Sequence, residues 1–141
     1  MKPYEDLIVS TAIQYNLDPD LLSAQVQVES SRDTFAFRYE SAFYGTYLKH
    51  GNPLSIIYGP LGACSFGLMQ IILEVAMELG FADRPEKLFI PQIGLEWGAK
   101  KMQALLKWSN NDYNRALSAY NAGMGSPVNL VYIKKVRDAV A

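Results

Sequence analysis

The sequence contains very few of the side chains that form disulfides, zinc sites or thiol and imidazole catalytic pairs. Its 141 residues include one cysteine, Cys64, and one histidine, His50. A single cysteine cannot form an internal disulfide, and the two residues together cannot supply the four ligands of a common Cys and His zinc site. We interpret Cys64 as a small buried thiol and His50 as a surface imidazole in a loop. Acid–base chemistry in this chain therefore depends on carboxylates, and we expect no metal and no cofactor.

The chain also lacks an excess of either charge and a long uninterrupted apolar run. Its 14 Asp and Glu residues nearly balance 13 Lys and Arg residues, which does not favour the broad basic surface of a nucleic-acid-binding protein, so we expect no such partner. Residues 50–73 contain no Asp, Glu, Lys or Arg, but prolines and glycines interrupt them, so we expect no membrane insertion. No basic region followed by an apolar run opens the chain, and no secretory signal is predicted.

Apolar side chains are abundant and recur with the period of a helix. Half of the residues are hydrophobic and 12% are aromatic, enough for one domain over residues 1–141 with its own core. No run alternates with period two, so we predict an all-α or nearly all-α domain, with at most a small hairpin in residues 50–70. Residues 32–63 have no sustained period and are expected to form a long irregular segment with one short helix near 42–49.

Helix caps and apolar spacing predict where the helices lie. The predicted helices are residues 3–16, 19–31, 73–79, 91–107 and 113–122, a single turn at 85–88, and a final helix that starts at Ser126-Pro127. Asp18 and Asp112 are the expected N-caps of two of these helices. Gly94 and Gly98 lie one turn apart in the longest helix, which predicts close approach of a neighbouring backbone.

One carboxylate differs from the other acids because it shares a helix face with apolar side chains. At about 100° per residue, Glu29 falls on one stripe with Leu22 and Val26. A carboxyl group against an apolar wall keeps its proton to higher pH, which suits a general acid. The alternative is a solvated Glu29 that pairs with Arg32, the only nearby basic residue.

Four short motifs follow one another along the chain. They are Glu29-Ser30, Gly67-Leu68-Met69-Gln70-Ile71, Ala119-Tyr120-Asn121-Ala122-Gly123, and Tyr132 followed by Lys135-Val136. In their order and placement they resemble the motifs of soluble lytic transglycosylases and goose-type lysozymes, a superfamily that includes phage endolysins. The resemblance extends over most of the chain, from about Leu7 to Val136.

This resemblance implies a lysozyme-like helical fold with a groove for the glycan strand of peptidoglycan. The implied reaction is cleavage of the β-1,4 bond between N-acetylmuramic acid and N-acetylglucosamine. Glu29 would protonate the leaving oxygen, and its carboxylate would then remove a proton from the muramyl C6 hydroxyl, giving a 1,6-anhydro product without water. One carboxylate is enough for such chemistry, because the substrate supplies the nucleophile.

The other motif residues are expected to contact the substrate. The implied substrate-binding residues are Gln70, Tyr120, Asn121, Tyr132, Met69 and Glu40. By resemblance, Gln70 would line the groove, and the Tyr120 hydroxyl would lie near Glu29 and orient the acid or the sugar. Two alternatives stay open, because Met69 is equally a candidate for the core and Tyr120 is alternatively a core tyrosine with a satisfied hydroxyl.

Two features depart from the family pattern. Glu29 and Gln70 are 41 residues apart, a longer separation than is usual for this motif pair. The inserted residues 38–40 are expected to form a wall of the groove, or to bring Glu40 across from Glu29. The residues immediately before the second motif are bulkier than usual, which puts a substrate contact by Ser65 in doubt.

Two other functions stay open at this point. A hydrolytic muramidase would use a second carboxylate, Glu40 or Asp33, to activate water. A non-catalytic helical module would bind glycan strands or a protein partner through the aromatic side chains of residues 35–47. As a wall-cleaving enzyme without an export signal, the chain is expected to be a monomer encoded by a phage, released to the periplasm through a separately encoded pore (a holin) or carried in the virion. A catalytic domain cut from a longer protein would look identical.

Overall fold

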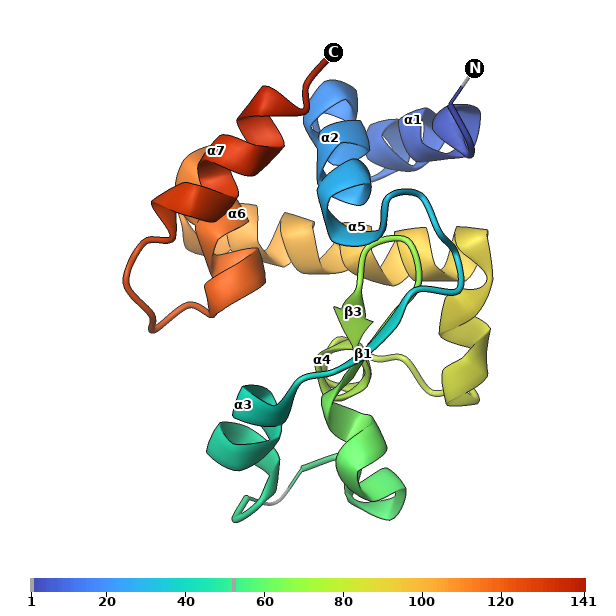
Figure 1. Cartoon of the computed structure of the whole chain (residues 1–141), viewed down its shortest axis with the longest axis vertical. Helices are drawn as coiled ribbons and strands as arrows, with labels where there is room; N and C mark the ends of the chain where they lie inside the picture. Colours follow the sequence, from blue (N-terminus) through green and yellow to red (C-terminus); the bar gives the residue numbers. More distant parts are fainter. Residues whose placement is uncertain (1, 52) are drawn as a thin grey trace.

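A body of helices packs against a smaller lobe that contains a short sheet (Figure 1). The computed structural model describes residues 2–51 and 53–141. The body comprises α1 (Glu5–Gln14), α2 (Pro19–Ser30), α5 (Pro91–Trp108), α6 (Tyr113–Ala122) and α7 (Leu130–Asp138). The smaller lobe comprises β1 (Phe37–Tyr39), α3 (Ser41–Phe43), η1 (Tyr44–Leu48), η2 (Ile56–Ala63), β2 (Cys64–Phe66), β3 (Ile71–Ile72), α4 (Leu73–Glu78) and η3 (Pro85–Phe89). The mostly helical architecture confirms the predicted fold class.

Two apolar clusters stabilise the body and the smaller lobe, and one turn contributes to both. Leu68 and Met69 belong to the cluster between the body helices. Phe66 and Ile71, which flank them in sequence, belong to the cluster of the smaller lobe. Full burial of such side chains contributes roughly 1.5–3 kcal/mol each. The turn of residues 67–70 therefore joins the two clusters.

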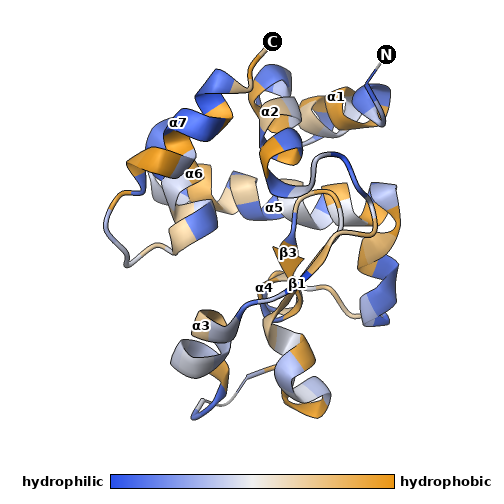
Figure 2. Ribbon diagram, viewed as in Figure 1, coloured by the Kyte–Doolittle hydropathy of each residue, from blue (hydrophilic) through white to orange (hydrophobic). Residues whose placement is uncertain are grey.

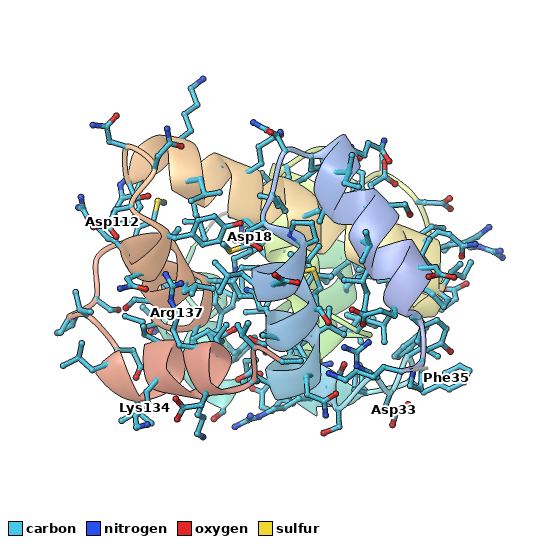
Figure 3. The ribbon with its side chains drawn as sticks, turned by 90° about the horizontal axis from the view of Figure 1, so that it is seen from above. Asp18, Asp33, Phe35, Asp112, Lys134 and Arg137 are labelled. Carbon is cyan, nitrogen blue, oxygen red and sulfur yellow. The ribbon has the colours of Figure 1, made fainter. Side chains whose placement is uncertain are left out.

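Side-chain caps begin α2 and α6, as the sequence predicts, and Figure 3 labels both capping residues. The Asp18 carboxylate accepts hydrogen bonds from the backbone N–H groups of Asp20 at 2.9 Å and Leu21 at 3.3 Å. The Asp112 carboxylate accepts one from the N–H of Arg115 at 3.0 Å. Each cap satisfies donors that a helix leaves free at its start, which is typically worth about 1 kcal/mol.

The two glycines of α5 lie where neighbouring groups leave no room for a side chain. A Cβ atom on Gly94 would lie 2.7 Å from the carbonyl oxygen of Leu88. At Gly98 the Cβ would lie 2.5 Å from the Sδ atom of Met69. Close approach of a backbone is therefore confirmed at Gly94, whereas at Gly98 the neighbour is a side chain.

The sheet is larger than the small hairpin predicted within residues 50–70. Strands β2 and β3 pair in antiparallel fashion, and β1 adds a third antiparallel strand on the other side of β2. Phe37 lies opposite Phe66, and Tyr39 lies opposite Cys64. All three residues of β1 are exposed, so this strand has no alternating pattern by which the sequence would reveal it.

The long segment predicted as irregular includes an excursion that leaves the sheet at the end of β1 and returns to it at the start of β2, the neighbouring strand. The Glu40 N–H donates to the carbonyl oxygen of Ala63 at 3.0 Å, and the Gly67 N–H donates to that of Ala36 at 2.8 Å. Helices α3 and η1 lie where the short helix near 42–49 was predicted, and the short helix η2 was not predicted. The segment therefore leaves the sheet and returns to it as a closed excursion.

The final helix starts later than predicted. Helix α7 begins at Leu130, not at Ser126-Pro127. The Ser126 hydroxyl donates to the carbonyl oxygen of Ala122 at 2.6 Å, so this side chain completes the end of α6. The N-cap of α7 is Asn129, whose Oδ1 accepts from the N–H of Tyr132 at 3.1 Å. A proline also disfavours helical conformation in the residue before it, which keeps Ser126 out of a helix.

Hydropathy follows the division between core and surface. Figure 2 shows α7 divided between hydrophilic and hydrophobic residues, and β3 hydrophobic throughout. Tyr132, Ile133 and Val136 are the buried residues of α7. Within residues 2–51 and 53–141, no helix combines the length and the apolar character that a membrane span needs.

Candidate active site

Glu29 lies in the last turn of α2, on a helix face that it shares with the apolar side chains of Leu22 and Val26. Leu22 and Val26 of the same face are 2% and 0% exposed, so the apolar stripe expected from the sequence is present. The Glu29 side chain itself is half-buried. Burial raises the pKa of Glu29 above the ordinary glutamate value, because the charged form loses solvation. Glu29 therefore keeps its proton closer to neutral pH than a solvated glutamate does.

Arg32 does not pair with Glu29, so this part of the solvated alternative is wrong. The guanidinium of Arg32 forms an ion pair with Glu5 at 2.8 Å and donates to the Ser23 hydroxyl at 2.7 Å. Ser31 and Arg32 both have left-handed backbone conformations, with φ of 51° and 64°. The chain therefore turns sharply after Glu29, and the arginine joins α1 and α2 instead.

Tyr132 on α7 makes the direct hydrogen bond to Glu29. Its hydroxyl donates to Oε2 of the carboxylate, and the tyrosine is only 4% exposed. Burial and the neighbouring Glu29 charge raise the pKa of the Tyr132 hydroxyl, so it keeps its proton. Donation to the ionised carboxylate lowers the pKa of Glu29 and partly opposes the effect of burial.

Lys101 on α5 adds a positive charge to the site, and sequence reasoning missed it. Its ammonium group donates to the carbonyl oxygen of Tyr120 at 3.0 Å and lies 4.1 Å from the centre of the Tyr120 ring. Burial lowers the pKa of Lys101 to about 8, while nearby carboxylates, Glu29 foremost, oppose that shift. The charge in turn lowers the pKa of Glu29. Lys101 shares a face of α5 with the buried Gly94 and Leu105, so helical spacing alone marks it as a charged residue on an apolar face, as it marks Glu29.

Glu40, which follows β1, is the second carboxylate that acts on Glu29. The negative charge of Glu40 raises the pKa of Glu29, while the positive charge of Arg38 lowers it. Glu40 accepts a hydrogen bond from the Ser65 hydroxyl at 3.0 Å and lies 3.7 Å from the guanidinium of Arg38. Residues 38–40 therefore contribute charges from the smaller lobe to the surroundings of Glu29.

Asp33 lies away from this group of charges. Its carboxylate accepts from the N–H of Phe35 at 2.9 Å and closes a turn on itself. Figure 3 shows Asp33 and Phe35 at the outer edge of the molecule, on the other side of α2 from the helix that carries Lys134. That helix is α7, which supplies Tyr132, and Asp33 is not among the charges that shift the pKa of Glu29.

Tyr120 and Met69 lie in the core beneath the site. The Tyr120 hydroxyl donates to the carbonyl oxygen of Met69 at 2.6 Å, so the hydroxyl that contacts Glu29 is that of Tyr132 instead. Glu29 nevertheless raises the pKa of Tyr120, second to burial. Met69 is 0% exposed, because Gly98 of α5 leaves space for its side chain. The expectation that Met69 contacts substrate is therefore corrected: its side chain is a core residue.

The polar side chains of Gln70 and Asn121 form hydrogen bonds within the protein, at a turn and at a helix end. The Gln70 amide donates to the carbonyl oxygens of Ala36 and Gly67, both at 3.0 Å. Gln70 has a left-handed φ of 49°, so its side chain supports the turn in which it stands. The Asn121 Oδ1 accepts from the amide of Asn129 at 2.8 Å, which connects the end of α6 to the cap of α7.

Cys64 and His50 do not form a catalytic pair. Cys64 is buried in β2 and its pKa is raised by burial, so the thiol resists ionisation, whereas His50 is exposed. Within the described parts of the chain, 2–51 and 53–141, no group of three or more His, Cys, Asp and Glu side chains could hold a metal ion.

Two hollows on the surface involve a different part of α5. They have volumes of about 290 and 530 Å³ and share Tyr15, Gln103 and Lys107 in their lining. Neither is lined by Glu29, Lys101 or Tyr132, and neither has a carboxylate in its lining. The candidate chemistry therefore rests on the cluster around Glu29.

Comparison with known proteins identifies the fold and the family of the chain. The solved structure of the lytic transglycosylase Slt from Pseudomonas aeruginosa, an inactive mutant with glutamine in place of a glutamate, superposes with a TM-score of 0.64 at 17% sequence identity. The match covers 94% of this chain and 20% of that protein, so the chain corresponds to about a fifth of its length. The family model of the transglycosylase SLT domain matches residues 6–137. The chain therefore belongs to the transglycosylase SLT domain family.

Proposed function

We propose that this chain is a peptidoglycan lytic transglycosylase that cleaves the β-1,4 bond between N-acetylmuramic acid and N-acetylglucosamine. Membership of the SLT family supports a peptidoglycan-degrading enzyme. The observation that carries the finer proposal is the state of Glu29, a half-buried carboxyl group with a raised pKa and a direct tyrosine donor. Raising the pKa of a carboxyl group toward the working pH suits it both to give and to take a proton within one reaction cycle.

In the proposed first step, protonated Glu29 acts as the general acid. Its proton passes to the glycosidic oxygen as the bond between that oxygen and C1 of the muramyl residue breaks. The burial that raises the pKa of Glu29 supplies the protonated form this step needs. The positive charge that develops at C1 is then left beside a newly ionised carboxylate.

In the second step, the Glu29 carboxylate acts as the base. It removes the proton from the muramyl C6 hydroxyl, and the oxygen forms a bond to C1 that closes the 1,6-anhydro ring. Glu29 ends protonated, so the cycle consumes no water and needs no second carboxylate. The Tyr132 hydroxyl and the Lys101 charge support this step, because both favour the ionised form of Glu29 between the two proton transfers.

Gln70, Asn121 and Glu40 are proposed to act on the glycan around this centre. Gln70 holds the turn of residues 67–70, and Asn121 connects the end of α6 to the cap of α7; each amide thereby fixes backbone groups that can meet a sugar. Glu40 faces the same centre from the smaller lobe, with Ser65 holding its carboxylate.

The test of the proposal is the Glu29→Gln variant on purified peptidoglycan. Removing a general acid is expected to lower turnover about 10²–10⁴-fold, while the fold is retained because glutamine can still accept the Tyr132 hydrogen bond. The matched control is Asp33→Asn, an exposed acid in a turn, which is expected to keep wild-type activity. Unchanged turnover in Glu29→Gln would exclude the assignment of Glu29. If the wild type and both variants were all inactive, the chain would instead be a binding module.

A hydrolytic muramidase is the second candidate, and one observation favours Glu40 over Asp33 as its second carboxylate. The charge of Glu40 acts on Glu29, whereas Asp33 closes a turn at the outer edge. Mass spectrometry of the digested wall separates the two reactions. The transglycosylase proposal expects 1,6-anhydro-muramyl products from both the wild type and Glu40→Gln. If the wild type gave only products with reducing ends, and Glu40→Gln gave none, the reaction would be hydrolysis and the transglycosylase proposal would be wrong.

A further inference from the structure

Gln25 is a buried amide that the proposed reaction does not yet use. It lies in the middle of α2, one turn before Glu29, and is 1% exposed. Its neighbours on the helix, Ala24 and Val26, are apolar and buried. A buried amide is destabilising unless it is hydrogen-bonded. Among the described residues, its Nε2 nevertheless makes no hydrogen bond of ordinary geometry.

Helix α7, which carries Tyr132, packs against α2. Gln25 and Glu29 are four residues apart, so they occupy the same face of α2, and Tyr132 approaches that face from α7 and donates to Glu29. The hydroxyl oxygen still has lone pairs that can accept a hydrogen bond. The Gln25 side chain lowers the pKa of Tyr132, as a donor to the phenolic oxygen does, against the larger effect of burial.

We propose that Gln25 is a positioning residue for the Glu29 site, donating from Nε2 to the Tyr132 hydroxyl oxygen while that hydroxyl donates to the Glu29 carboxylate. This inference rests on the proposed function, in which Glu29 must accept and release a proton. The chain runs from an amide through a hydroxyl to a carboxylate, and all three groups are on two packed helices.

Such a chain has two effects on the reaction. A donor to the Tyr132 oxygen polarises its O–H bond, so the hydroxyl binds more strongly to ionised Glu29 than it would alone. The amide also keeps the tyrosine ring in the one orientation that aims the hydroxyl at the carboxylate. Both effects favour the state between the two proton transfers, when Glu29 is ionised.

The other charges near Glu29 are distinct from this chain. Lys101 reaches the site from α5, while Glu40 and Arg38 reach it from the smaller lobe. None of these residues is on α2 or α7. Changing Gln25 therefore leaves the charges around Glu29 in place, and the effect of the variant can be assigned to the hydrogen-bond chain.

The test is Gln25→Met, which keeps the length of the side chain and removes its donor. The pKa of Glu29, followed by NMR on the labelled carboxyl carbon, is expected to rise by about half a unit to one unit. Turnover is expected to fall about three- to ten-fold, and the alkaline limb of the pH profile should move upward with the pKa. The matched control is Leu21→Met, a buried and volume-conserving change on the same helix, which should alter neither quantity.

A double variant separates positioning from a general loss of packing. In Tyr132→Phe the phenolic oxygen is absent, so adding Gln25→Met should cause no further rise in the pKa of Glu29 and little further loss of turnover. Additive effects would mean that Gln25 acts on packing alone, and would overturn the proposal. An unchanged pKa and turnover in the single variant would overturn it as well.

Wild-type protein provides a measurement that does not depend on the folding of Gln25→Met. The side-chain amide resonance of Gln25 should shift as Glu29 titrates, because the hydrogen-bond chain connects the two groups. A resonance that ignores this titration would overturn the proposal. Failure of the proposed function is distinguishable, because Glu29→Gln would then remain fully active, or no variant would be active, whatever the NMR shows.

Discussion

The hydroxyl of Tyr132 can be removed with little change of shape, and the result depends on the sign of its effect on Glu29. In Tyr132→Phe the carboxylate loses its direct donor. Hydrogen bonds to charged groups contribute about 1.5–3 kcal/mol. At 1.36 kcal/mol per pKa unit, the loss corresponds to a rise of about one to two units in the pKa of Glu29.

The direction of the change in activity follows from the proposed role of protonated Glu29 as the general acid. Activity is lost as pH rises through the pKa of the general acid, so a higher pKa should move the alkaline limb of the kcat/KM profile upward. Turnover at the optimum should fall, because the ionised intermediate form of Glu29 loses its stabilising partner. The assay is the initial rate of peptidoglycan solubilisation between pH 4 and 9, a range that covers the ordinary glutamate pKa of about 4.3 and values well above it.

The stability of the same variant gives an independent check. Loss of the donor destabilises the folded state chiefly where Glu29 is ionised, so the stability difference from wild type should grow as pH rises. At low pH, where Glu29 is protonated in both proteins, the difference should be small. A limb that stays in place or moves to lower pH, or a stability difference that does not change with pH, would refute the reasoning.

Three further predictions concern charge, titration and packing. Lys101→Met should raise the pKa of Glu29 and move the alkaline limb of activity upward, because the lysine charge lowers that pKa; an unmoved limb would contradict this. Glu29→Gln should gain stability relative to wild type as pH rises above the ordinary glutamate pKa of about 4.3, because the raised pKa makes ionised Glu29 destabilising in the folded state; a stability difference that stays constant in thermal unfolding at several pH values would contradict this. Gly98→Ala would bring a Cβ within 2.5 Å of the Met69 sulfur, so unfolding should become easier by about 1–3 kcal/mol. Gly45→Ala, with nothing within 4 Å of its Cβ, is the control; equal melting temperatures for the two variants would show that the Gly98 contact is not restrictive.

Local signals in the sequence predict those parts of the fold that local forces determine. Asp18 and Asp112 cap the helices they were expected to cap, because a cap involves only the next few residues. The apolar stripe around Glu29 is likewise a property of one helix. Pairing of β1 with β2 joins distant parts of the chain, and an exposed strand carries no periodic pattern, so that part of the sheet was not predictable.

The candidate site shows the same division. The position of Glu29 on an apolar face is visible in one helix, but its partners come from other elements. The Tyr132 hydroxyl, and not that of Tyr120, contacts Glu29 because Met69 offers its carbonyl group to Tyr120. Lys101 reaches the site only through the packing of α5 against α6. Such choices depend on tertiary packing, which the spacing of motifs does not encode.

The closed excursion between β1 and β2 explains how the separation of Glu29 and Gln70 along the chain can be long without changing their positions in space. Its ends are held together by the hydrogen bond between Glu40 and Ala63. Lengthening a loop whose ends are already fixed costs little, about 0.6 kcal/mol for each doubling of its length. In evolution or design, the segment inside this pairing can therefore be exchanged for one of another length or composition. The surface that the segment presents then changes, while Glu29, Tyr132 and Gln25 keep the positions that their helices give them.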